Sequence, residues 1–347
     1  MGDGCLEEFS LAENTRLIIK ENVLAVICDN GLKTVGSAIF NGGCKQVKAV
    51  LNIGVPEGYS DLFLHLDPLQ LITSSAAIVG ITKDYLAMVT AAKIRNYSLV
   101  CKKTDDYTIY VAATAGCSHG ESSGEDMAVE EIVGTINIIV FIDGNPAESC
   151  MVAALITATE AKSAALRDFD VRSRYTGDSA TGSITDAVTV AATGRGKEVV
   201  LGGPASKLGK LVGYCARKAV TEALLKQEPI WANRTVFDRL KERHLPIEKL
   251  AAEVSKIEDL ALTTEELTQI LKHNPQTLAT LLAATKMDDD YNKNLLPTDF
   301  KDWNAATQTP NKTTAQETNY DAVNLPPFIK TALIKIIKAQ QHKQVGK

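Results

Sequence analysis

Several features that mark particular protein classes are missing from this 347-residue sequence. The N-terminal run MGDGCLEEFS holds no apolar stretch of the kind that a secretory signal needs, so no signal peptide is expected. No apolar run reaches the roughly eighteen residues of a membrane-spanning helix, and we expect a cytoplasmic protein. The seven cysteines are odd in number and include no Cys-x-x-Cys pair, which favours free thiols and argues against the commonest zinc site.

Aromatic residues and net positive charge are also scarce. Aromatic side chains make up 5% of the chain, too few for the stacking surfaces that bind single-stranded nucleic acid. The 37 basic and 42 acidic residues leave a formal charge of -5, whereas nucleic-acid proteins usually carry a basic face. We therefore expect neither nucleic acid nor a membrane as a partner, and a homo-oligomer stays open.

The chain changes character near residue 230. Before that point it is rich in Gly, Ala, Val and Ile, and after it Lys, Glu, Leu, Asn and Thr prevail. We place a domain boundary at residues 227–229, where a helical pattern runs into a proline. The prediction is a first domain over 1–228, a short helical appendage over 229–287, and a polar linker with a terminal helix over 288–347.

Short β-branched runs and long Ala-rich runs predict the secondary structure of the first domain. Strands are expected over about 15–28, 35–40, 47–52, 85–91, 107–113, 134–142 and 187–192. Helices are expected over about 68–79, 146–168 and 206–226, and a terminal helix over 326–341. This order predicts an α+β fold, with a mixed or largely antiparallel sheet covered by helices and a C-terminal helical appendage.

Glycine, asparagine and small hydroxyl residues gather where the predicted strands begin or end. These places are NGG at 41–43, Asn52, TAGCSHG at 114–120, GTIN at 134–137 and TGSITDA at 181–187. Such residues let the backbone approach a ligand closely. Each run alone is also what an ordinary turn contains, but together they indicate a polar ligand site.

The helix expected over 146–168 carries Glu160, a candidate general base, among alanines and threonines. On a 3.6-residue period Thr157, Glu160 and Ala161 share one face, and partial burial there would suit a general base. The alternative is that Glu160 and Lys162 are both solvated on an exposed face. Lys162 lies about 200° further around the helix, so it does not face Glu160 directly.

Five runs, taken in order, resemble the adenosylcobinamide amidohydrolases, a family that salvages corrinoids in archaea and some bacteria. They are GSAIFNGG (36–43), TAGCSHG (114–120), GTINIIVFIDG (134–144), ALITATEAKSAALRD (154–168) and SATGSITDAVTVAATG (179–194). The resemblance covers roughly residues 10–227. It implies hydrolysis of the amide that joins aminopropanol to the corrin side chain, giving adenosylcobyric acid and 1-amino-2-propanol. The cobalt corrinoid is then the substrate, and neither a cofactor nor a protein-bound metal is expected.

Carried over residue by residue, the resemblance assigns catalysis to Glu160, Lys162 and Asp186. It assigns substrate binding to Ser37, Asn41, Gly42, Gly43, Asn52, Ser118, His119, Asn137 and Thr181. The family often has Asn where His119 stands and Gly-Thr where Gly182-Ser183 stands, so a hydroxyl is kept at position 183.

Two routes to amide hydrolysis stay open. Glu160 or Asp186 could activate water, with Lys162 or the backbone N–H groups of residues 41–43 stabilising the oxyanion. Alternatively, the hydroxyl of Ser118 or Thr181 could attack, with a neighbouring base. A non-catalytic corrinoid-binding protein is the alternative from a different functional class.

Overall fold

A computed structural model describes residues 7–56, 68–118, 120–125, 134–257, 260–272, 274–296 and 322–345. The chain divides into two compact units. The first comprises residues 1–175 and 179–233, and the second comprises 176–178 and 234–347. Among the described residues, no helix combines the length and the apolar character that crossing a bilayer requires.

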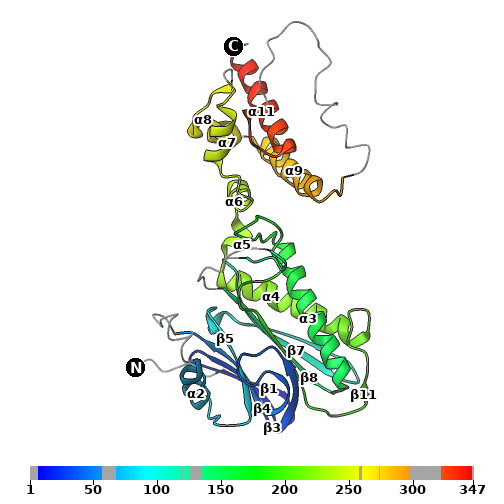
Figure 1. The fold of residues 1–347 in the computed structure, drawn as a ribbon. Coiled ribbons are helices and arrows are strands. Elements are labelled where there is room, and N and C mark those ends of the chain that lie inside the picture. The colour runs from blue at the N-terminus through cyan, green and yellow to red at the C-terminus, as the bar shows by residue number, and fades with distance from the viewer. Residues whose placement is uncertain are drawn as a thin grey trace. The chain divides into compact units, whose positions relative to one another are not determined.

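The first unit is built on a nine-stranded sheet in the order β1-β2-β3-β10-β8-β7-β6, with β4 paired to β3 and β5 paired to β4 (Figure 1). The strands are β1 Glu7–Ala12, β2 Thr15–Lys20, β3 Val23–Gly36, β4 Gly43–Gly54, β5 Tyr85–Thr90, β6 Ser98–Lys103, β7 Thr108–Gly116, β8 Thr135–Asp143 and β10 Ala187–Ala192. The pairs β8–β10 and β4–β5 are parallel, and the other pairs are antiparallel. The predicted α+β class with a mixed, largely antiparallel sheet is therefore confirmed.

Strand β8 is buried on both faces, which explains its nearly continuous apolar sequence. Alternate residues from Ile136 to Ile142 pack against helices α3 (Glu148–Asp168) and α4 (Lys207–Gln227), which cover one face of the sheet (Figure 1). The residues between them, including Ile139 and Phe141, face an inner core shared with β3, β4 and β5. Helix α2 (Pro68–Ile78) packs against a third cluster on β3 and β4.

Helix α3 forms because its sequence is rich in alanine, the best helix former. Its alanines at 154, 158, 161 and 165 are all buried, and they form a narrow stripe that lets the helix lie close to its neighbours. Glu148 in its first turn and Arg167 in its last turn suit the helix dipole. The stripe also carries Lys162 into the interior, where it is 7% exposed.

The predicted helices correspond to α2, α3, α4 and α11 (Pro327–Val345), but the strand predictions need four corrections. The range 15–28 is two strands, β2 and β3, joined at Glu21, whose φ is 52°. The strand over 35–40 is wrong, because β3 ends at Gly36 and the chain turns back until Phe40 bridges Ala87 of β5. Strands β1 and β6 were not predicted, because their EEFSLA and SLVCKK sequences are short and half polar.

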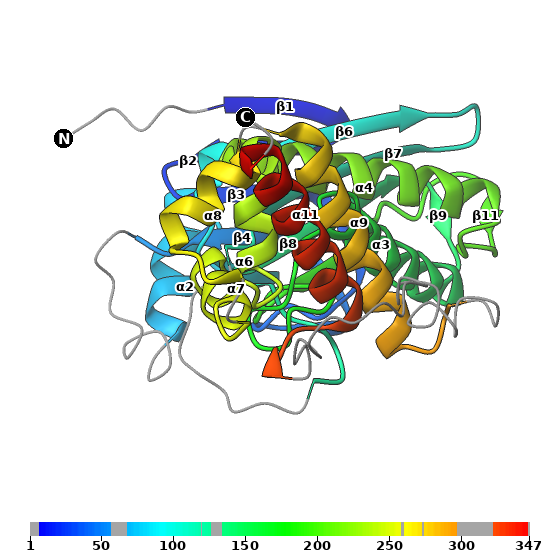
Figure 2. The same cartoon turned by 90° about the horizontal axis from the view of Figure 1, so that it is seen from above.

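The second unit is helical and has its own apolar core. It contains α6 (Val236–Lys241), α7 (Ile247–Val254), α8 (Thr264–Lys272), α9 (Pro275–Asn292) and α11. Helices α9 and α11 lie side by side (Figure 1, Figure 2), and the buried Asp288 of α9 accepts from the backbone N–H groups of Phe328 and Ile329 at 2.9 Å each. The linker expected from residue 288 therefore begins inside a helix, and residues 297–321 of it lie outside the described part.

Candidate active site

A buried ion pair joins helix α3 to the turn that enters β10. Lys162 Nζ donates to Asp186 Oδ2, and the two side chains are 9% and 10% exposed. Charges removed from water are costly unless they are paired, so each of these residues accounts for the burial of the other. Two of the three residues that the sequence assigned to catalysis are thus in direct contact.

Three further donors hold the Asp186 carboxylate. Its Oδ1 accepts from the Ile136 N–H at 2.9 Å and from the hydroxyl of Ser183, and its Oδ2 accepts from the Ser183 N–H at 3.0 Å. With Lys162, four donors address one carboxylate, which is about all that its lone pairs accept. The carboxylate therefore ties α3, the turn at 183–186 and the beginning of β8 together.

The ion pair explains why residue 182 is glycine. A Cβ at Gly182 would lie 2.4 Å from Asp186 Oδ2 and 2.8 Å from Lys162 Nζ. Cys117 is buried beside the same turn, with its Sγ 3.8 Å from the Gly182 carbonyl oxygen. Burial, with a smaller contribution from the Asp186 charge, raises the pKa of the Cys117 thiol well above its usual range. A thiol in that state is a poor nucleophile.

A second polar cluster lies in the inner core and consists of Asn52, Thr114 and Asn137, which are 2%, 0% and 1% exposed. Asn137 Nδ2 donates to Asn52 Oδ1 at 2.8 Å and to the Val89 carbonyl oxygen at 3.0 Å. Asn52 Nδ2 donates to Thr114 Oγ1 at 2.9 Å. Two residues assigned to substrate binding, Asn52 and Asn137, therefore contact each other across strands β4 and β8.

The ion pair and the Asn52–Thr114–Asn137 cluster lie at the same end of the parallel pair β8–β10. Ile136, whose N–H binds Asp186, immediately precedes Asn137, and Ala187, the register partner of Asn137, immediately follows Asp186. The Asn137 side chain faces the inner core and the ion pair lies on the α3 side, so the two groups occupy opposite faces of the sheet at this end. This end of the strand pair is the candidate active site.

Ser37 and Thr181 lie beside this end, and Ser118 is held by a carboxylate. Ser37 Oγ accepts from the Val188 N–H at 3.1 Å, and the Thr181 carbonyl oxygen accepts from Ser163 of α3 at 2.9 Å. The Ser118 N–H donates to Glu228 Oε1 at 3.1 Å. His119 lies outside the described residues.

The remaining predicted residues are not brought into this group. Glu160 is exposed, so the partial burial hypothesised for it is wrong, and it lies on the opposite side of α3 from Lys162. Asn41, with a φ of 55°, donates to the Tyr85 carbonyl oxygen at 2.9 Å, four residues and about 13 Å along β5 from Val89. Gly43, with a φ of 87°, and Gly42 complete that turn.

The sequence did not identify Thr114 or Glu228 as site residues. Glu228 Oε1 accepts from the backbone N–H groups of Cys117 and Ser118, at 3.0 and 3.1 Å, and its Oε2 accepts from Trp231 Nε1 at 2.6 Å. Thr114 belongs to the TAGCSHG run but was not singled out within it. The contacts of Glu228 with Cys117 and Ser118 join residues 111 and 110 positions apart, which no local pattern shows. Within the part of the chain that the structure describes, no three His, Cys, Asp or Glu side chains gather as a metal site requires.

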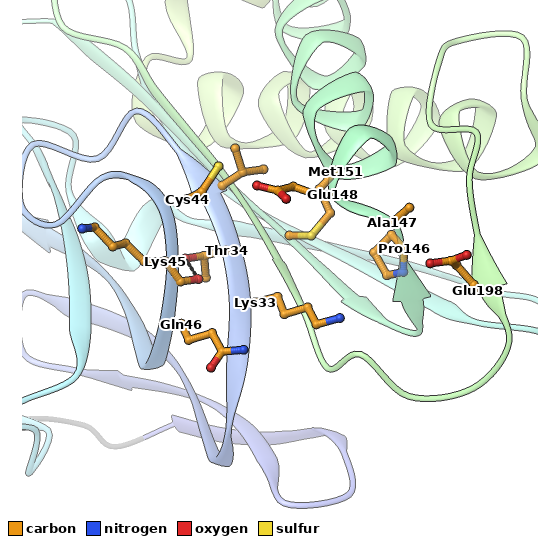
Figure 3. A pocket seen from close by; sticks show the side chains of 11 residues that line it. Lys33, Thr34, Cys44, Lys45, Gln46, Pro146, Ala147, Glu148, Met151 and Glu198 are labelled. Carbon is orange, nitrogen blue, oxygen red and sulfur yellow. Dashed lines mark hydrogen bonds between the residues drawn. The ribbon is translucent and has the colours of Figure 1, made fainter.

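A groove of about 420 Å³ lies at the other end of β8, where α3 begins (Figure 3). Its lining includes Lys33, Lys45, Glu148, Met151 and Glu198, and none of the predicted site residues. A hydrogen bond to Glu148 raises the pKa of the Cys44 thiol, which lies beside that carboxylate in Figure 3. The groove and the candidate active site are therefore separate places on the first unit.

Comparison with known families covers the unit that carries these residues. The family model described as adenosylcobinamide amidohydrolase matches residues 7–232. The chain belongs to the adenosylcobinamide amidohydrolase family. The resemblance inferred from the sequence motifs is thus confirmed, and every candidate site residue named above lies inside the region that matches this family.

Two curated relatives are similar to this member of the adenosylcobinamide amidohydrolase family. It is 29% identical over 215 residues to the adenosylcobinamide amidohydrolase of Methanosarcina mazei, covering 60% of this chain and 92% of that protein. It is 28% identical over 209 residues to an uncharacterized protein of Methanocaldococcus jannaschii, covering 54% of this chain and 81% of that one. A crystal structure of a Pyrococcus horikoshii protein aligns at a TM-score of 0.34 and 11% identity, over 59% of this chain and 77% of that one.

Proposed function

We propose that this chain hydrolyses the amide between aminopropanol and the corrin side chain of adenosylcobinamide, giving adenosylcobyric acid and 1-amino-2-propanol for cobamide salvage. The observation that carries the proposal is the family match over residues 7–232, because it includes the ion pair and the Asn52–Thr114–Asn137 cluster. The corrinoid, with its cobalt, is substrate, and the proposal invokes no further cofactor. A cytoplasmic location and a homo-oligomer remain predictions.

In the route we favour, water attacks the carbonyl carbon, the C–N bond breaks, and the leaving amine takes a proton. Lys162 is the cation available to the developing oxyanion. Among the described residues, Asp186 is the one hydrogen-bond partner of the Lys162 ammonium group. This group therefore keeps N–H donors for an oxygen of the ligand. Asp186 is the carboxylate bound to this cation; when one of its four protein donors gives way, it accepts the proton of the attacking water and then passes it to the leaving amine.

A second route uses a hydroxyl as the nucleophile. The Ser183 hydroxyl donates to Asp186 Oδ1, so its proton has an acceptor if its oxygen attacks the amide carbon. The acyl ester formed on Ser183 would then be hydrolysed by water. The Thr181 hydroxyl lies 2.9 Å from the Ser123 hydroxyl, and no carboxylate among the described residues accepts its proton. Trapping with hydroxylamine distinguishes the routes, because it intercepts an acyl ester.

One observation favours the alternative of a non-catalytic corrinoid-binding protein. All the acceptor positions of Asp186 are occupied by protein donors, as expected of a carboxylate that only supports the fold. Incubation with adenosylcobinamide, followed by chromatography, tests both functions. Release of 1-amino-2-propanol supports the hydrolase, whereas co-elution of unchanged corrinoid with the protein supports the binding protein.

A further inference from the structure

The Asn52–Thr114–Asn137 cluster is incomplete as a hydrogen-bond network. Asn137 Oδ1 is buried and has no partner among the described residues. The Thr114 oxygen accepts from Asn52 Nδ2, which leaves the hydroxyl proton of Thr114 without an acceptor in the described chain. Burying an unpaired acceptor costs about 1–3 kcal/mol. The cluster thus presents one free acceptor and one free donor.

The orientation of Asn137 that leaves its oxygen unpaired is fixed by its surroundings. Its Nδ2 lies against two oxygens, Asn52 Oδ1 and the Val89 carbonyl oxygen. Turning the amide over would place Oδ1 against the Val89 oxygen, which offers no proton. The Asn137 Oδ1 atom therefore stays unpaired, and it lacks an N–H or O–H donor from outside the cluster.

We infer that this cluster binds a neutral amide of the ligand, with the ligand N–H donated to Asn137 Oδ1 and the ligand carbonyl accepting from the Thr114 hydroxyl; the inference rests on the proposed corrinoid function. An amide carries both groups, whereas a carboxylate carries only acceptors and would meet Asn137 Oδ1 with repulsion. The cluster would therefore bind amides in preference to carboxylates.

The rim of the cluster toward solvent is made of small residues. Ala187, opposite Asn137 in the register, is 9% exposed and carries only a methyl group. Ser37 is exposed and binds the adjacent Val188 N–H. Asn137 Oδ1 is itself covered, so the inference requires this rim to open when the ligand binds. The Lys162–Asp186 pair lies at the same strand end but on the other face of the sheet, beside α3.

The amide has two sources, the scissile amide and the ring carboxamides of the corrinoid, and the choice of ligands separates them. We would measure the affinities of adenosylcobinamide, of adenosylcobyric acid, and of an analogue whose ring carboxamides are carboxylates. Stopped-flow corrinoid absorbance records binding before turnover. The proteins are the wild type, Thr114→Val, Asn137→Ala and, as matched control, Thr189→Val. Thr189 is a fully buried threonine whose hydroxyl contacts Met88 Sδ at 3.6 Å.

We expect the wild type and Thr189→Val to prefer adenosylcobinamide at least tenfold over one of the two carboxylate ligands. Weak binding of adenosylcobyric acid identifies the scissile amide, and weak binding of the other analogue identifies a ring carboxamide. Thr114→Val and Asn137→Ala should lose most of the preference. Equal wild-type affinities, or an undiminished preference in the isosteric Thr114→Val, overturn the inference. If a variant does not fold, the wild-type ligand series decides.

Turnover of the wild type is recorded separately. Turnover without an amide preference overturns this inference and leaves the proposed hydrolase standing. An amide preference without turnover supports the inference and overturns the hydrolase.

Discussion

Replacing Lys162 by methionine tests whether the ion pair serves the fold alone or also the chemistry. Methionine keeps much of the side-chain volume in a position that is 7% exposed, but leaves the Asp186 carboxylate without its cation. Breaking a buried pair in this way costs about 3–5 kcal/mol. Three donors to Asp186 remain, so we expect a loss in the free energy of unfolding near the lower figure, about 3 kcal/mol.

The double variant Lys162→Met/Asp186→Asn removes the unpaired charge and should recover part of that stability. Arg217→Met is the matched control on the same helix pair, because Arg217 binds Asp168 of α3 with both side chains about half exposed. An exposed pair of this kind contributes at most about 1 kcal/mol. Urea unfolding of the four proteins measures these differences.

Turnover of adenosylcobinamide, measured where each variant is folded, separates chemistry from stability. Loss of an oxyanion-stabilising group lowers the rate about 10²–10³-fold. We expect this loss of turnover in both Lys162→Met and Lys162→Met/Asp186→Asn. The Arg217→Met control should keep the wild-type rate. A Lys162→Met protein that is destabilised yet turns over normally per folded molecule would refute the catalytic role, and one with unchanged stability would refute the burial argument.

Three further predictions follow from other residues. Glu160→Gln should change the free energy of unfolding by less than about 0.5 kcal/mol and turnover less than tenfold, because Glu160 is exposed and faces away from Lys162; a larger loss of turnover would restore it as the base. Burial raises the pKa of Asp288 from 3.8 to about 6, and the N–H groups of Phe328 and Ile329 partly offset this effect. The protonated side chain of Asp288 therefore contributes its full stabilisation below pH 3.8, and this stabilisation is lost as the pH rises through 6. Wild type should therefore lose at most about 2 kcal/mol relative to Asp288→Asn between pH 4 and pH 7, and equal pH profiles would contradict this. Dialysis against EDTA should leave turnover unchanged, because Lys162 supplies the positive charge in the proposed route; activity restored only by added metal would contradict it.

The sequence predicts most of the first unit where local pattern and tertiary environment agree. Strand β8 and helix α3 were predicted because a β-branched run and an alanine-rich run match the period of their elements. The strand predicted over residues 35–40 is wrong because the apolar sequence pattern continues past Gly36, where β3 ends. A Cβ at Gly36 would lie 2.4 Å from Thr189 Oγ1. Whether a strand continues depends on such contacts, which the local pattern does not contain.

The site shows the same division between local and distant information. The motif over 154–168 predicts both Glu160 and Lys162 as catalytic residues, and the alanines around Glu160 suggest that its side chain is partly buried. The buried stripe of Ala158, Ala161 and Ala165 instead continues through Lys162, so the lysine is the residue that faces inward. Thr114 and Glu228 were missed because their roles depend on partners in other strands and helices.

The Glu228 carboxylate has a consequence for how the protein is made. It binds the backbone at Cys117 and Ser118, which are synthesised 111 and 110 residues earlier. During translation the segment that contains Ser118 therefore emerges long before the Glu228 carboxylate that binds it. The same carboxylate accepts a hydrogen bond from the Trp231 indole, which is synthesised three residues later. Synthesis must therefore proceed past residue 228 before the contacts of this carboxylate with Cys117 and Ser118 can form. A shortened gene that stops at residue 227 would encode every motif of the family and still yield a loop without its anchor.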